Sequence, residues 1–201
     1  SSAESDVYKR QGSIRKRKIN YDGMTFHIET DRLILRELRL SDLDKMFELD
    51  SNIEVHKYLG NKPVKTKEES LQILESILCQ YKERGIGRWA AIEKLSNEFI
   101  GWSGLRLNTE YDMNGFTRYY DVGYRLLPQF WGKGYATDSG KAAVDYAFSA
   151  MILPKLYATT EIGNEASHKA LLKIGLKYVE DFYFEQENLD LRWYKIENRT
   201  L

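Results

Sequence analysis

The segment YYDVGYRLLPQFWGKGYA, residues 119–136, decides the fold. Apolar side chains at every second position over 122–126 give the period of a β-strand. Pro128 lacks a backbone donor, so strand pairing ends there. Small and apolar residues then recur at helical spacing over 136–151. The segment therefore predicts a strand over 119–127, then a turn, then a helix.

The turn lacks a usual helix cap. No Ser, Thr, Asn or Asp directly precedes the first helical residues, so the N–H groups of the first turn have no side-chain acceptor. Gly132 and Gly134 leave these groups uncovered, while the helix dipole and Lys133 add positive charge. The pattern predicts either a bound phosphate or a glycine turn whose amides bind water.

Two common phosphate-binding loops do not fit this segment. A Walker A loop needs a hydroxyl group after its Gly-Lys pair, but Ala142 follows Gly140-Lys141. A dinucleotide-binding fingerprint needs a third glycine, and Thr137 stands at that position. Both classes are excluded.

The pattern Gln129-x-x-Gly132-x-Gly134 resembles the acetyl-CoA pyrophosphate loop of the GNAT superfamily of N-acetyltransferases. The likeness continues in Gly123-Tyr124, in Trp131–Thr137, in Asn164-x-x-Ser167 with Lys173-x-Gly175, and in ETDRLILR at residues 29–36. These motifs are similar to the RimJ/RimL-like branch, the ribosomal-protein-alanine acetyltransferase-like enzymes. The resemblance covers most of residues 26–197.

The resemblance implies an α/β fold of GNAT type: a mixed, mostly antiparallel sheet flanked by helices, with a central strand-loop-helix acetyl-CoA site. The strands at 119–127 and 156–162 are expected to splay apart at their C-terminal ends, where the pantetheine arm would pair with the free strand edge. Acetyl-CoA is the expected cosubstrate, with no metal. The expected acetyl-CoA-binding residues are Leu126, Gln129, Gly132, Lys133, Gly134, Tyr135, Ala136 and Asn164.

Acetyl transfer to an amine requires removal of a proton, because alkylamines are mostly protonated at neutral pH. Asp121, at a position where the family often carries an acid, is the expected catalytic base. Glu161 is the second candidate, followed by Glu185 or Glu187. By the same resemblance, Ser167 would face the thiol and protonate it. For Asn164 and Ser167 the alternative is simple helix capping.

Composition excludes several functions. Lys plus Arg and Asp plus Glu both number 30, so no overall basic field would attract nucleic acid or an anionic membrane. No apolar run approaches the roughly 18 residues of a membrane span. Three scattered histidines and a single cysteine, Cys79, give no metal cluster. Cys79 is expected to be buried, and the protein to be cytoplasmic.

The rest of the chain predicts alternating elements. Residues 1–23 are expected to be a disordered leader or an artefact, and residues 24–201 a single N-acetyltransferase domain. His168 is expected on a solvated helix face. Strands are predicted over 26–38, 88–95, 98–107, 156–162, 178–184 and 189–196, and helices over 41–51, 66–85 and 165–174.

The expected reaction is direct transfer of acetyl from acetyl-CoA to a primary amine, either a peptide N-terminus or a small-molecule amine. The alternative is a CoA-binding sensor of the same fold without catalysis. A monomer or a homodimer is expected. The segment 53–67 carries four lysines against Glu54, so it should not attract a polycation such as spermidine.

Overall fold

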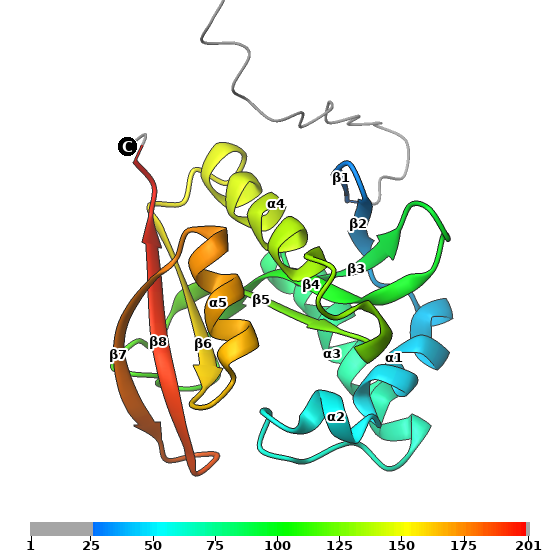
Figure 1. The fold of residues 1–201 in the computed structure, drawn as a ribbon, viewed down its shortest axis with the longest axis horizontal. Helices are drawn as coiled ribbons and strands as arrows, with labels where there is room; N and C mark the ends of the chain where they lie inside the picture. Colours follow the sequence, from blue (N-terminus) through cyan, green and yellow to red (C-terminus); the bar gives the residue numbers. More distant parts are fainter. Residues whose placement is uncertain (1–25, 200–201) are drawn as a thin grey trace, which may run out of the picture.

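The structure, a computed structural model, describes residues 26–199, so the predicted leader lies outside the described residues (Figure 1). Its centre is an eight-stranded sheet with the order β1-β2-β3-β4-β5-β6-β8-β7. Only the β5–β6 pair within the described sheet is parallel. The strands are β1 His27–Glu29, β2 Leu33–Glu37, β3 Arg88–Glu93, β4 Phe99–Asn108, β5 Tyr119–Leu126, β6 Lys155–Glu161, β7 Lys177–Phe184 and β8 Leu189–Glu197. The predicted mixed, mostly antiparallel sheet is confirmed.

Helices cover both faces of this sheet. They are α1 Leu43–Asp50, α2 Ile53–His56, α3 Lys67–Arg84, α4 Tyr135–Ser149 and α5 Glu165–Ile174. Figure 1 shows α4 and α5 side by side in front of the sheet, with α3 behind it. Successive side chains of β3 point to opposite faces of the sheet. Trp89 and Ala91 belong to the core under α4 and α5, whereas Ala90 and Ile92 pack with α1 and α3.

The sheet opens between its two parallel strands. β5 and β6 pair only at Asp121 and Tyr157, near the start of both strands. Beyond that point, residues 122–126 of β5 have no strand partner on the β6 side. The predicted splay of these strands is confirmed, and it leaves an unpaired strand edge in the middle of the sheet.

The first predicted strand is wrong in one respect, because residues 26–38 form two strands. The Thr30 hydroxyl accepts the N–H of Leu33 at 2.9 Å, and the Thr30 N–H donates to the Leu33 carbonyl at 2.9 Å. This side-chain-stabilised turn folds β1 back onto β2.

The first helix starts differently from the prediction. A 3₁₀ turn, Leu40–Asp42, comes before α1, and the Asp42 side chain stabilises it by accepting the N–H of Arg39 at 2.8 Å. The short helix α2 was not predicted. Its signal was Asn52, whose side chain accepts the N–H groups of residues 54 and 55.

The longest helix agrees with its predicted start at Thr66, which accepts the N–H of Glu69 at 3.3 Å. Cys79 is exposed, contrary to expectation, because α3 turns Leu74 and Ile77 inward and Cys79 outward. Within residues 26–199, no helix has the length and apolar character needed to cross a membrane.

Candidate active site

The loop before α4 presents free backbone donors. Gly132 and Gly134 have φ values of 73° and 84°, in the left-handed region that favours glycine, and Gly134 is the uncapped N-cap of α4. Among residues 26–199, no protein group accepts the N–H groups from Gly132 to Thr137. The predicted absence of a side-chain cap is confirmed. A row of unpaired amides at a helix N-terminus suits an anion with several oxygens.

Arg32, at the turn into β2, holds this loop in place. Its Nη1 donates to the Lys133 carbonyl at 2.7 Å, and its Nε donates to Asp138 Oδ2 at 2.7 Å. The guanidinium carbon also lies 4.6 Å from the centre of the Tyr135 ring, whose hydroxyl donates to Glu93. In the sequence, Arg32 is only one residue of the motif at 29–36, and nothing there predicts its contacts with the loop.

The other loop side chains pack beside the amides. Lys133 Nζ lies 5.2 Å from the centre of the Phe130 ring, and Gln129 is exposed. The Trp131 indole donates to the Leu126 carbonyl at 2.7 Å. The unpaired β5 edge therefore lies mainly before Leu126, whose carbonyl already has a partner.

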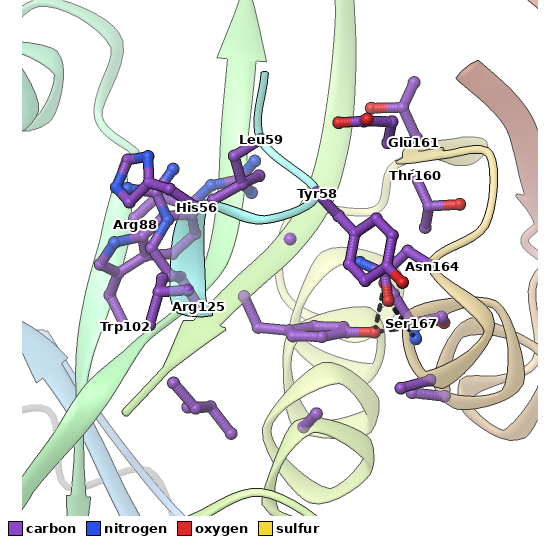
Figure 2. Close-up of a pocket in the computed structure, with 18 of the residues that line it drawn as sticks. His56, Tyr58, Leu59, Arg88, Trp102, Arg125, Thr160, Glu161, Asn164 and Ser167 are labelled. Carbon is purple, nitrogen blue, oxygen red and sulfur yellow. Dashed lines mark hydrogen bonds between the residues drawn. The ribbon is translucent and has the colours of Figure 1, made fainter. Parts of the chain in front are cut away.

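A cavity of about 1400 Å³ occupies the opening between β5 and β6. The amide loop, α5, the connection between α2 and α3, and the turn between β7 and β8 line it. Glu161 Oε2 accepts the Gly60 N–H at 3.2 Å and so ties the connection to the end of β6. Figure 2 shows Tyr58 from this connection facing Asn164 and Ser167. The connection forms one wall of this cavity.

A pair of hydroxyl groups faces the opening. The Tyr124 hydroxyl lies 3.0 Å from Ser167 Oγ, and Asn164 Oδ1 accepts the Ser167 N–H at 3.1 Å (Figure 2). Burial raises the pKa of Tyr124 to about 12, although its hydrogen bond with Ser167 opposes this. The phenol is therefore protonated at neutral pH and can donate. Sequence reasoning named Ser167 and Asn164 but gave Tyr124 no role, although Gly123-Tyr124 carried part of the resemblance.

Asp121 is held between two arginines. Its Oδ1 lies 2.6 Å from Arg88 Nη2, its Oδ2 lies 3.3 Å from Arg106 Nη2, and the residue is 8% exposed. Burial alone would raise the pKa of Asp121, but the two guanidinium groups outweigh it and hold the pKa below its ordinary value. Such a carboxylate is a poor proton acceptor, so this geometry favours charge pairing over base catalysis.

The remaining acidic candidates are spread around the cavity. Glu161 and Glu187 line it, and Glu185 is an exposed residue of the β7–β8 turn. His168 corrects an expectation, because it does not lie on a solvated face. Its Nδ1 lies 2.8 Å from the hydroxyl of the fully buried Tyr194, so the ring is partly covered.

Comparison with known protein families shows which family this chain belongs to. The family model described as an acetyltransferase (GNAT) domain matches residues 32–177, which include the amide loop, Tyr124 and Ser167. The chain belongs to the GNAT acetyltransferase family. The match begins at Arg32, the residue that holds the loop.

Several relatives of this acetyltransferase are N-acetyltransferases by name. It is 31% identical over 173 residues to an uncharacterized N-acetyltransferase of Bacillus subtilis. The aligned region covers 86% of this chain and 90% of that relative. It is 30% identical to the FsC-acetyl coenzyme A-N(2)-transacetylase of Aspergillus fumigatus over 78% of this chain and 67% of the relative. It is 27% identical to the spermidine N(1)-acetyltransferase of Escherichia coli over 70% of each chain.

A solved structure shares the fold. A GNAT family acetyltransferase from Bacillus anthracis superposes with a TM-score of 0.71 at 24% identity, covering 86% of this chain and 99% of that one. The two chains therefore share the same overall fold.

Proposed function

We propose that this acetyltransferase moves the acetyl group of acetyl-CoA directly to a primary amine. The observation that carries the proposal is the continuity between the free amides from Gly132 to Thr137 and the unpaired edge of β5. The amides match the pyrophosphate of CoA. The strand edge offers donors and acceptors to the amide groups of pantetheine, as a neighbouring strand would.

The binding residues divide by the part of the cofactor they would hold. Gly132, Gly134, Tyr135 and Ala136 would contribute backbone amides, and Lys133 a charge near the phosphates. Gln129 would stand at the loop entrance and Leu126 at the end of the strand edge. Asn164 uses its Oδ1 to cap α5, so its amide nitrogen remains able to donate to pantetheine.

The reaction needs the neutral amine to attack the thioester carbonyl. The N–C bond forms, an oxyanion develops that β5 backbone amides can stabilise, and the C–S bond breaks. The departing thiolate takes a proton from the Tyr124–Ser167 hydroxyl pair. The proton lost by the amine goes to a carboxylate directly or through water. Glu161 fits that role better than the arginine-paired Asp121.

The acceptor is a peptide N-terminus or a small-molecule amine, as in the RimJ/RimL-like branch that the motifs resemble. The experiment is an acceptor screen that follows thiol release from acetyl-CoA and identifies the acetylated amine by mass spectrometry. The proposal predicts release that depends on the amine. Saturable CoA binding without turnover on any amine would instead favour the sensor alternative.

A further inference from the structure

His56, at the end of α2, is a buried ring without hydrogen-bond partners. It lines the cavity, is only 6% exposed, and neither ring nitrogen makes a hydrogen bond with the described protein. Burial and then the nearby Arg125 charge lower the pKa of His56, and they outweigh the Asp50 carboxylate and backbone, which favour the charged ring. The ring is thus a neutral group that carries one N–H donor and one acceptor nitrogen. Buried polar groups normally have a partner.

Arg125, on β5, lies beside His56 and is fixed in place. Its Nη1 donates to Asp50 Oδ1 at 3.0 Å, and its guanidinium carbon lies 5.1 Å from the centre of the Trp102 ring. Asp50 itself is fully buried and also accepts from Ser70 Oγ at 2.9 Å. The Nε of Arg125 is buried and donates to no described residue. Arg125 is therefore preorganised and retains donor capacity.

The charges at this end of the cavity do not cancel. Arg88 and Arg125 pair with the buried Asp121 and Asp50, and the partly exposed Arg106 adds a third guanidinium group beside Asp121. Four acidic residues also line the cavity: Glu54, Glu69 and Glu187 are exposed, and Glu161 lies on the side opposite His56 (Figure 2). Figure 2 shows His56, Arg88, Trp102 and Arg125 gathered on one side of the cavity, with Glu161, Asn164 and Ser167 on the other.

We propose that the subsite formed by His56, Arg125 and Trp102 binds a carboxylate carried by the acceptor. The substrates would then be amines that also bear a carboxylate, such as amino acids or short peptides with a free C-terminus. The inference rests on the proposed function, because it places the amine end of the acceptor toward the Tyr124–Ser167 pair. A carboxylate supplies the missing negative charge and accepts the N–H groups that lack partners.

The test uses matched amines that differ only in this group. Alanyl-alanine is compared with its C-terminal amide, and 4-aminobutanoate with 4-aminobutanamide. The carboxylate member of at least one pair should have the higher kcat/KM by about 10- to 100-fold, the range for a hydrogen bond to a charged group. Acetylation with equal kcat/KM for both members of each pair would overturn the inference and leave the proposed function intact.

Variants separate binding from folding. His56→Phe should remove most of the carboxylate preference, while His56→Gln, which keeps a side-chain donor, should retain part of it. Because Arg125→Gln alone strands a buried Asp50 carboxylate, the double variant Asp50→Asn/Arg125→Gln is used, and it should also lose the preference. The control Lys82→Gln removes an exposed charge on α3 outside the cavity and should keep the preference. Equal losses on carboxylate and amide substrates would show a purely structural role and contradict the inference.

The two proposals fail in different ways. If no amine is acetylated, the proposed function is wrong, and calorimetric titration of the CoA-loaded protein with the same pairs still decides the subsite. Tighter binding of the carboxylate member, lost in His56→Phe, supports it. Equal binding of both members, or no binding, refutes it.

Discussion

The hydroxyl groups of Tyr124 and Ser167 lie 3.0 Å apart, joining β5 to α5 at the opening of the sheet. Because the pKa of Tyr124 is raised to about 12, this pair keeps a proton available throughout the neutral range. In the proposed reaction, this pair would supply the proton that the departing thiolate needs.

Replacing this acid should slow the chemical step. Tyr124→Phe is expected to lower kcat by about 10²-fold, within the usual range for a general acid, with little change in the KM for acetyl-CoA. Ser167→Ala should lower kcat by less, and the double variant should be no worse than Tyr124→Phe alone. The alkaline limb of the kcat profile should not show loss of the Tyr124 proton below about pH 10. Unchanged kcat in Tyr124→Phe would rule the phenol out as the acid.

Arg32 should matter for CoA affinity although it does not line the cavity. Arg32→Gln removes the donors to the Lys133 carbonyl and Asp138. The amide loop should then be less preorganised, and we expect the Kd for CoA to rise about 10-fold, with kcat at saturation little changed. Asp138→Asn, which leaves the Lys133 contact in place, should have a smaller effect. Calorimetric titration with CoA measures both, and equal affinity in wild type and Arg32→Gln would contradict this role.

The two acidic candidates should behave differently. Asp121→Asn leaves Arg88 and Arg106 without their buried carboxylate and should cost about 3–5 kcal/mol of unfolding free energy, measured by urea denaturation. Glu161→Gln, which can still accept the Gly60 N–H, should keep its stability but lose kcat/KM at neutral pH. A stable Asp121→Asn protein that has lost only activity would restore Asp121 as the base.

Which features of the structure can be predicted from the sequence depends on how far apart the interacting residues lie along the chain. The strand, loop and helix over 119–151 follow from local signals: alternation, Pro128, glycines and helical spacing. The contact of Arg32 with Lys133 spans 101 residues, and the arginines that hold Asp121 come from β3 and β4, so no local pattern reveals either. The division of 26–38 into two strands depended on a single threonine turn.

Stability should fall in mild acid because of His56. Burial first, then the Arg125 charge, lower the pKa of His56, although Asp50 opposes them. The unfolded chain therefore binds a proton near pH 6.5 that the folded protein does not, so unfolding free energy decreases as pH falls from about 7 toward the lower, folded-state pKa. His56→Gln should have a shallower decrease between about pH 7.5 and about pH 5.5 in denaturant titrations. Identical slopes would mean that His56 is not held neutral.

We propose that backbone amides, rather than a side chain, hold the pyrophosphate of CoA. Calorimetric titration with CoA of wild type, Gly134→Asp and Lys133→Ala tests this directly. Gly134→Asp adds a side chain at a φ of 84°, with Cβ 3.2 Å from Arg32 Nη2, and places negative charge beside the phosphates, so binding should be lost. Lys133→Ala should weaken binding only a few-fold, about 1 kcal/mol, as expected for an exposed charge. Near-normal binding by Gly134→Asp together with loss of binding by Lys133→Ala would contradict the account.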